Sequence, residues 1–224
     1  MKEQHSFIMP AIKAKVYNGN INSNAEPPSL EKLAGPILHE QIEKEIAYFT
    51  VPWIASADEK ICTAYADSLQ NIIRYYDNLG VTKWVIDLRK NSGGNCWPML
   101  AGLGPLIGNG IHGYFVSSDE KIPFSYVDGS ALQGKHVRCT VTNPYSAIER
   151  KRQIILLVSP GTCSAGEIVA IAFKGKKDVY LYGEPTAGLT TANATYKLSD
   201  GSLLVLTVGK EADRNGKICE GRIW

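Results

Sequence analysis

The sequence lacks the features that mark several classes of protein. None of its cysteines belongs to a Cys-x-x-Cys pair and their number is odd, which argues against a disulfide scaffold and a structural zinc site; they are Cys62, Cys96, Cys139, Cys163 and Cys219. No run of eighteen apolar residues occurs, so no segment is expected to span a membrane. The start, "MKEQHSFIMP", has no apolar signal core. The protein is therefore expected to be cytoplasmic, or exported with its leader absent from this chain.

An excess of charge of one sign is also missing. Lys and Arg number 24 against 22 Asp and Glu, a net charge of +2, which gives no reason to expect a nucleic acid partner or an anionic membrane surface. The short basic runs "ERKR" (149–152) and "KGKK" (174–177) fit solvated loops or helix ends. With 224 residues, 44% of them hydrophobic, the chain is long enough to bury a core and is expected to form one domain.

The chain contains alternating strand and helix patterns. Apolar stretches predict strands at 46–54, 83–89, 153–159 and 178–183, with weaker ones at 111–117 and 135–142 and a hairpin over 194–209. Helices are predicted at 56–79 (between Ser56 and Gly80), 97–107 and 164–173, and 17–37 is expected to be a long loop. This order favours an α/β fold with crossover helices, in which sites form where strands end.

The stretch "SPGTCSAGEIVAIAF" (159–173) allows two interpretations of Ser164. With Glu167 it has the Ser-x-x-Glu spacing of a capping box ahead of an apolar helix. A serine at a sharp strand-to-helix turn is also suited to act as a nucleophile, because the helix amino terminus stabilises a developing oxyanion. Spacing alone favours the cap. The adjacent Cys163 is expected to be a small packing residue, with a thiol nucleophile as the alternative.

Glycines and histidines provide further candidates. "NSGGN" (91–95) is either a plain strand-to-helix turn or a turn whose N–H groups bind an oxyanion; it is neither a dinucleotide-binding nor a Walker A motif. "HEQIE" (39–43) fails the zinc-protease pattern His-Glu-x-x-His. His136 is expected to be structural, His112 has no partner that the sequence identifies, and spacing assigns nothing to His5.

Four segments in order resemble the S41 family of serine peptidases, the carboxyl-terminal-processing or tail-specific proteases. They are "EQHSFIMP", "VIDLRKNSGGN", "VSPGTCSAGEIVAIAF" and "YGEPTAGLTTAN…YKLSDGS", followed by "ADRNGKICEGR" near the end. The sequence is most similar to the branch with tricorn-core, retinoid-binding-protein-like and nisin-resistance-type members. The resemblance implies an α/β core of the ClpP/crotonase type with crossover helices and a β-rich carboxyl-terminal part.

The resemblance also implies roles for individual residues. Ser164 would be the nucleophile and His5 the general base, close to each other in space, with Glu220 orienting or tuning the base. The backbone N–H groups of Gly93, Gly94 and Ala165 would form the oxyanion hole. Substrate-binding residues would be Asn95, Thr186, Gly188 and Asn193, and no metal or cofactor is expected.

Two departures from the family pattern stand out. The Ser/Lys branch carries a catalytic lysine where this chain has Leu189, and Lys174 lies on another part of the motif, so a histidine base is expected. The amino-terminal helical part and the PDZ domain of the family are not in this chain, which is expected to be a single catalytic domain over residues 1–224.

The expected function is therefore hydrolysis of peptide bonds through an acyl-enzyme on Ser164. The substrate would be a peptide or protein, bound extended along a strand edge. The alternative is an inactive module of the same fold that binds a peptide or an apolar ligand. The resemblance implies a location outside the cytoplasm and allows membrane association of a longer protein; the sequence does not indicate the oligomeric state.

Overall fold

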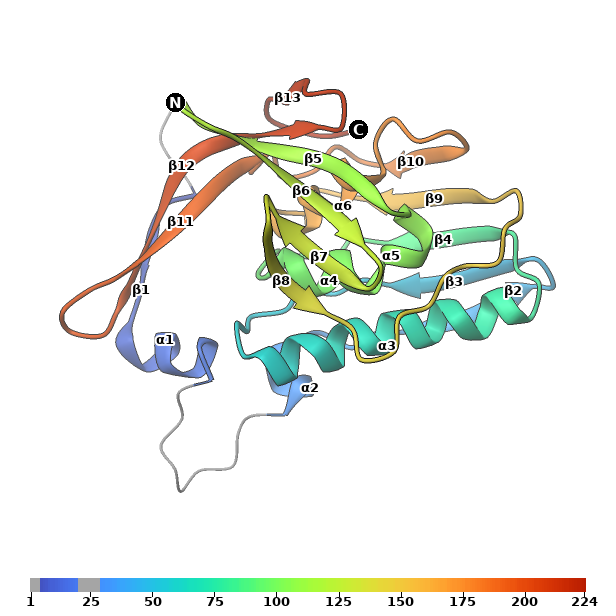
Figure 1. Ribbon diagram of the computed structural model, residues 1–224, viewed down its shortest axis with the longest axis horizontal. Helices are drawn as coiled ribbons and strands as arrows, with labels where there is room; N and C mark the ends of the chain where they lie inside the picture. Colours follow the sequence, from blue (N-terminus) through green and yellow to red (C-terminus); the bar gives the residue numbers. More distant parts are fainter. Residues whose placement is uncertain (1–4, 20–28) are drawn as a thin grey trace.

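The computed structural model describes residues 5–19 and 29–224, which form two β-sheets with helices packed between and beside them (Figure 1). One sheet has five strands, in the order β10 (Val179–Gly183), β9 (Gln153–Val158), β4 (Lys83–Asp87), β3 (Ile46–Thr50) and β2 (His39–Glu43). The other has eight: β1 (Phe7–Met9), β12 (Leu203–Asp213), β5 (Gly110–Val116), β6 (Lys121–Val127), β7 (Ser130–Gln133), β8 (His136–Thr140), β11 (Thr191–Lys197) and β13 (Ile218–Cys219).

The five-stranded sheet is parallel except for β2. The connection from β3 to β4 runs through α3 (Glu59–Asn78), and the connection from β9 to β10 runs through α6 (Ala165–Phe173). Parallel neighbours need such crossover connections. The expected mixed α/β content is confirmed, with strands dominating. Because β4 and β9 are parallel neighbours, the "NSGGN" turn and the Ser164 turn follow adjacent strand ends.

The eight-stranded sheet is antiparallel and differs from the expected location of the β-rich part. It combines β1, the meander β5–β8 and the carboxyl-terminal strands, so it is not confined to the end of the chain. In Figure 1, β11, β12 and β1 extend as an arm with α1 (Ala11–Tyr17) at its foot. β12 pairs with β1 on one edge and with β11 on the other, which brings residues from both ends of the chain together.

Three predictions about helices and loops are corrected. The cap of α3 is Asp58, whose Oδ1 accepts the N–H of Ile61 at 3.0 Å, rather than Ser56. The helix expected over 97–107 is two, α4 (Cys96–Gly102) and α5 (Gly104–Ile107), with Pro105 in the first turn of α5, where its missing N–H costs no helical hydrogen bond. Within 17–37, α2 (Leu30–Leu33) is helical, and residues 20–28 lie outside the described residues.

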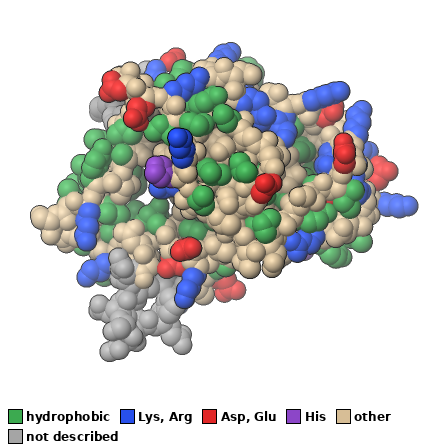
Figure 2. Space-filling model, in the orientation of Figure 1, with side chains coloured by type: hydrophobic (Ala, Val, Ile, Leu, Met, Phe, Trp, Pro, Cys, Tyr) green, Lys and Arg blue, Asp and Glu red, His purple; other side chains and the backbone are tan. Residues whose placement is uncertain are grey.

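A single hydrophobic core lies between the two sheets. It joins Phe49 and Leu156 of the five-stranded sheet with Leu69 of α3, Met99 of α4 and Phe124 of the eight-stranded sheet. No helix in the described part of the chain is long and apolar enough to cross a bilayer. Lys and Arg are interspersed with Asp and Glu on the face in Figure 2, and the surface is hollowed between the arm and the body.

Candidate active site

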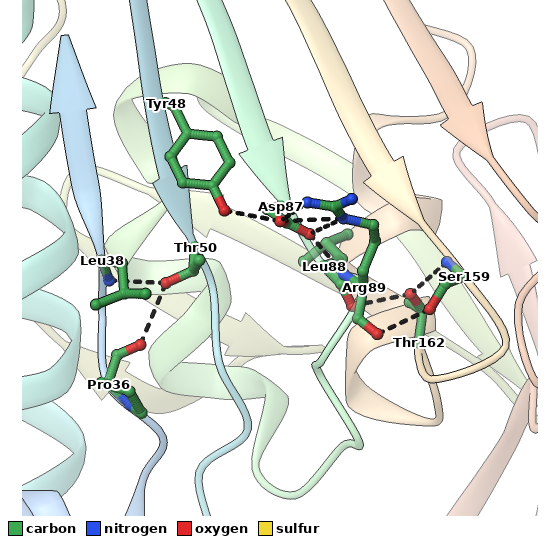
Figure 3. A network of polar contacts seen from close by, with 9 residues as sticks. All are labelled: Pro36, Leu38, Tyr48, Thr50, Asp87, Leu88, Arg89, Ser159 and Thr162. Carbon is green, nitrogen blue, oxygen red and sulfur yellow. Dashed lines mark hydrogen bonds and ion pairs between the residues drawn. The ribbon is translucent and has the colours of Figure 1, made fainter. Parts of the chain in front are cut away.

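The turns after β4 and β9 are bonded to each other (Figure 3). The buried hydroxyl of Thr162 donates to Leu88 O at 2.8 Å and accepts the N–H of Ser159 at 3.1 Å. The Ser159 hydroxyl donates to Arg89 O, also at 2.8 Å. These bonds satisfy backbone groups that leave the sheet ladder at the strand ends. The two turns therefore hold a fixed position relative to each other.

An ion pair supports the end of β4. The carboxylate of Asp87 accepts hydrogen bonds from the Arg89 guanidinium, at 2.7 Å from Nη2, and from the Tyr48 hydroxyl at 2.8 Å (Figure 3). Burial would raise the pKa of Asp87, but these bonds and the Arg89 backbone N–H hold it below its ordinary value. The residue is charged at neutral pH and holds the Arg89 backbone in place.

Asn91 connects three segments at the bottom of the site. Its fully buried side chain donates from Nδ2 to Val51 O at 2.9 Å and accepts the N–H of Gly93 at 3.0 Å through Oδ1. Its carbonyl oxygen accepts the N–H of Cys163 at 2.9 Å. Asn91 therefore shapes the glycine turn and anchors the segment that carries Ser164. The sequence analysis assigned it no role, although it opens the "NSGGN" motif.

Glycine is required at both positions of the turn. Gly93 and Gly94 have φ of 108° and 101°, a region that side chains rarely adopt. A Cβ at Gly93 would lie 3.1 Å from Ser164 Cβ, and one at Gly94 would overlap the carbonyl oxygen of Ile54. The glycine turn thus brings its backbone against the turn that carries Ser164.

Ser164 stands at the amino terminus of α6 in an unusual conformation. Its φ is 50° and its ψ is −113°, and among the described residues the other non-glycine positions with positive φ are aspartates, Asp128 and Asp178. A cap residue ordinarily has extended backbone geometry. Strain of this kind is concentrated at functional sites. The Ser164 hydroxyl oxygen lies 2.9 Å from Nε2 of His5, so the prediction that these residues are close, 159 positions apart, is confirmed.

His5 is held in place by strand pairing and by polar contacts. β1, which begins two residues later, pairs with β12, and the Ser6 hydroxyl accepts the N–H of Thr207 at 3.0 Å. Asn193 Nδ2 donates to the carbonyl oxygen of His5 at 3.2 Å. On the ring, Nδ1 lies 2.6 Å from Oγ1 of Thr191. Both ring nitrogens thus face hydroxyl groups.

Glu167 is a buried carboxylate at the centre of the site. Oε2 accepts the N–H groups of Ser164 at 2.9 Å and of Leu189 at 2.8 Å. Oε1 accepts the Gly188 N–H at 2.8 Å and the Thr186 hydroxyl at 2.5 Å. The capping-box spacing is therefore realised in the bond to Ser164. The spacing did not reveal that the same carboxylate also holds the segment leading to β11.

The residues expected to bind substrate are engaged in structural contacts. Asn95 caps α4 by accepting the Trp97 N–H at 3.1 Å, and it donates to Ser56 O. Thr186 is fully buried and Gly188 is half-buried, both against Glu167. Asn193 supports the backbone of His5. The structure gives these side chains and amides positioning contacts, which sequence spacing does not distinguish from contacts with a substrate.

Glu220 differs from its expected place. Its exposed carboxylate pairs with Nζ of Lys210 at 2.7 Å, and this pairing lowers the pKa of Glu220. The hydroxyl of Thr191 occupies the position beside His5 Nδ1 that an orienting acid would take. Exposure explains the difference, because a solvated acid near a lysine pairs with it at little cost in desolvation.

Lys174 does not lie beside Ser164. Lys174 directly follows α6, about 15 Å along the helix axis from Ser164, and its carbonyl oxygen accepts a hydrogen bond from Arg214 at 3.1 Å. Leu189, at the position of the family's lysine, donates a hydrogen bond from its backbone N–H to the Glu167 carboxylate. In the part of the chain that the structure describes, no group of three His, Cys, Asp or Glu side chains could hold a metal ion.

Cys163 is partly buried and its thiol lies 3.7 Å from Pro160 O. Burial, and then the negative charge of Glu167, raise the pKa of the Cys163 thiol. The thiolate is the reactive form of cysteine, so this environment disfavours a cysteine nucleophile.

The amide groups near Ser164 are not equivalent. The Gly93 N–H donates to Asn91, which differs from the expectation that it is available for an oxyanion. The N–H groups of Gly94 and Ala165 have no acceptor within residues 5–19 and 29–224. The Ala165 nitrogen would lie 3.6 Å from a Cβ on Gly93, so it faces the glycine turn.

A hydrogen-bonded serine and histidine beside amides without acceptors, on a mixed α/β fold, are typical of a peptidase site. The sequence pattern of peptidase family S41 matches residues 45–223, and the chain belongs to this family.

Similar proteins include a nisin-resistance protein of Lactococcus lactis subsp. lactis, 32% identical over 95% of this chain and 65% of that protein. A chloroplastic carboxyl-terminal-processing peptidase 2 of Arabidopsis thaliana is 33% identical over 58% of this chain and 22% of that protein. A solved lipoprotein of Streptococcus agalactiae has the same fold, with a TM-score of 0.77 and 24% identity over 98% of this chain and 70% of that one. The chain thus spans less than two thirds of the length of the nisin-resistance protein and of the carboxyl-terminal-processing peptidase 2.

Proposed function

We propose that this protein is a serine peptidase in which Ser164 is the nucleophile and His5 the general base. The observation that supports it best is the 2.9 Å separation between Ser164 Oγ and His5 Nε2. Nucleophile and base must lie within hydrogen-bond reach for proton transfer. Membership of a peptidase family agrees with this assignment.

In the proposed mechanism, neutral His5 takes the hydroxyl proton of Ser164 through Nε2 while Oγ attacks the carbonyl carbon of the scissile peptide bond. The protonated imidazole then gives this proton to the leaving amine, and the carbon–nitrogen bond breaks to leave an acyl-serine. Water attacks the ester with His5 again accepting a proton, which returns to Ser164 Oγ when the acid is released.

The oxyanion of the tetrahedral intermediate would be bound by the N–H groups of Gly94 and Ala165. Both amides lack an acceptor among the described residues, whereas the Gly93 N–H is already taken by Asn91. The amino terminus of α6 adds a positive electrostatic potential at the same place. Donors that are fixed before the reaction need no reorganisation in the transition state.

The substrate would be a peptide or protein, since relatives of this chain are named carboxyl-terminal-processing peptidases. Residues 1–224 would act as one catalytic domain with a ClpP/crotonase-type core. The family resemblance also favours action outside the cytoplasm. Cell fractionation of the full-length protein tests the location.

The test of the proposed chemistry is reaction of the 224-residue protein with diisopropyl fluorophosphate, followed by mass spectrometry of the Ser164 peptide. We expect one phosphoryl adduct on Ser164 and hydrolysis of fluorescein-labelled casein. Both should disappear in Ser164→Ala, with a stability loss of about 1 kcal/mol or less. Ser68→Ala, a serine on α3, is the control and should behave as the wild type.

A folded wild-type protein without adduct on Ser164 would contradict the proposal. If it also bound casein without cleaving it, the chain would instead be a peptide-binding module of the S41 fold. An adduct that persists in Ser164→Ala would place the nucleophile elsewhere.

A further inference from the structure

A histidine base acts on a serine only in one tautomer. Of the two ring nitrogens of a neutral imidazole, one donates and the other accepts. For His5 to accept the Ser164 proton at Nε2, the ring hydrogen must be on Nδ1. The group that Nδ1 faces therefore decides how much of the histidine is in the reactive form.

We infer that Thr191 is the positioning residue of this base: its hydroxyl oxygen accepts the Nδ1–H of His5 and thereby fixes the tautomer that can deprotonate Ser164. The inference rests on the proposed function. It is motivated by the 2.6 Å separation between His5 Nδ1 and Thr191 Oγ1, on the side of the ring opposite the 2.9 Å contact with Ser164. Thr191 lies in the family-like segment "YGEPTAGLTTAN", but the sequence indicated no role for it.

The contact is suited to both states of the catalytic cycle. The neutral imidazole in the reactive tautomer carries its hydrogen on Nδ1, and the imidazolium formed after proton transfer keeps that hydrogen. The bond to Thr191 is therefore present before and after the proton moves. The ring is held in one orientation while Nε2 exchanges a proton with Ser164.

The position of Thr191 is set by contacts other than the one with His5. Thr191 is the first residue of β11, opposite Lys210 of β12. Just before it, the buried hydroxyl of Thr190 donates to Cys219 O at 2.9 Å, and the Leu189 N–H is bound by Glu167. Since Glu167 also binds the Ser164 N–H, the strand carrying Thr191 is joined to the turn that carries Ser164. The Thr191 hydroxyl is thus in place to receive His5.

The test compares Thr191→Val, which keeps the shape and removes the hydroxyl, with Thr191→Ser, which keeps the hydroxyl. Thr195→Val is the matched control, an exposed threonine on the same strand. The first measurement is the rate of Ser164 phosphorylation by diisopropyl fluorophosphate at constant pH. We expect roughly a tenfold loss for Thr191→Val, since the base loses its fixed orientation. Thr191→Ser and Thr195→Val should stay near the wild-type rate.

The second measurement is the ¹⁵N shift of the two His5 ring nitrogens, assigned with His5→Ala. The wild type should carry its hydrogen on Nδ1 in the neutral form, and Thr191→Val should gain the Nε2–H form. A purely structural role would leave the tautomer unchanged.

A wild-type rate of phosphorylation in Thr191→Val, or an unchanged tautomer, would overturn the inference. Equal losses in Thr191→Val and Thr195→Val would do the same. The NMR readout needs no activity, so it tests Thr191 even if Ser164 proves unreactive, which would be failure of the proposed function.

Discussion

At the scale of single residues, the site depends on residues held in unfavourable conformations. Ser164 has a positive φ, which costs on the order of 1–3 kcal/mol and persists only where surrounding bonds maintain it. In one of those bonds the N–H of the preceding residue, Cys163, donates to Asn91 O. In the other, the N–H of Ser164 itself donates to the Glu167 carboxylate. In this backbone conformation the Ser164 hydroxyl points to His5.

The base can be identified from its pH dependence. If His5 is the base, the rate of Ser164 phosphorylation by diisopropyl fluorophosphate should rise with pH through one ionisation, because only the neutral imidazole accepts a proton. His5→Ala should lose about 100-fold or more in rate and the pH dependence with it. Lys174→Ala should keep the wild-type profile, since Lys174 lies at the other end of α6. Rates measured from pH 5 to 9 check this, and a collapse in Lys174→Ala alone would contradict it.

Cys163 offers a second test at this scale. Its thiol has a raised pKa because of burial and the neighbouring Glu167. We therefore expect Ser164 of Cys163→Ala to be phosphorylated at within about twofold of the wild-type rate, with stability changed by about 1 kcal/mol or less. The same labelling assay and thermal unfolding measure both. Loss of labelling in a fully folded Cys163→Ala protein would show that the thiol takes part in the chemistry.

At the scale of elements, the site is where three strand ends and one helix meet. The turns after β4 and β9 are joined through Thr162 and Ser159 (Figure 3), and the amino terminus of α6 is joined to the segment before β11 through Glu167. These side-chain bonds, together with the backbone bond from Cys163 N–H to Asn91 O, hold the elements in their relative positions.

Glu167→Gln should disturb this junction. The amide would present donor hydrogens to N–H groups that the carboxylate now accepts, so at least one of them loses its partner. We expect a stability loss of about 1–3 kcal/mol and slower phosphorylation of Ser164 by diisopropyl fluorophosphate. Glu184→Gln, at an exposed glutamate, is the control and should change neither. A wild-type rate in Glu167→Gln would show that the junction does not position the nucleophile.

At the scale of the whole molecule, a buried acid makes the stability of the fold depend on pH. Glu211 of β12 is buried, its Oε2 has no partner among the described residues, and burial together with Glu167 raises its pKa well above the ordinary value. The folded protein therefore keeps a proton on Glu211 that the unfolded chain releases. Its contribution to stability is present below the unfolded pKa and falls as pH rises towards the folded pKa.

Glu211→Gln should remove this dependence, because glutamine is neutral at every pH. We expect the variant to have the stability of the wild type near pH 5 and to be more stable at pH 8, by about 1 kcal/mol or more. Denaturant unfolding at the two pH values is the measurement, with Glu184→Gln as the exposed control. A difference between variant and wild type that does not grow with pH would contradict a protonated Glu211.

Several features follow from local sequence alone. The apolar stripe of α3, the apolar runs of β4 and β9, and the glycine turn at 93–94 each depend on neighbours within a few residues. The pairing of Ser164 with His5 was implied by the resemblance to the S41 family and not by local spacing. Helix ends were less predictable, because Asp58 competed with Ser56 for the cap of α3.

Tertiary structure decided the contacts that join distant parts of the chain. The 2.9 Å contact between His5 and Ser164 depends on the pairing of β1 with β12, whose partners are almost 200 positions apart in sequence. The contacts of Thr191 and Glu220, and the use of the Gly93 N–H by Asn91, likewise depend on packing between segments. Local propensity specifies which residues form a strand, but which hydroxyl meets a ring nitrogen is set by long-range register and burial.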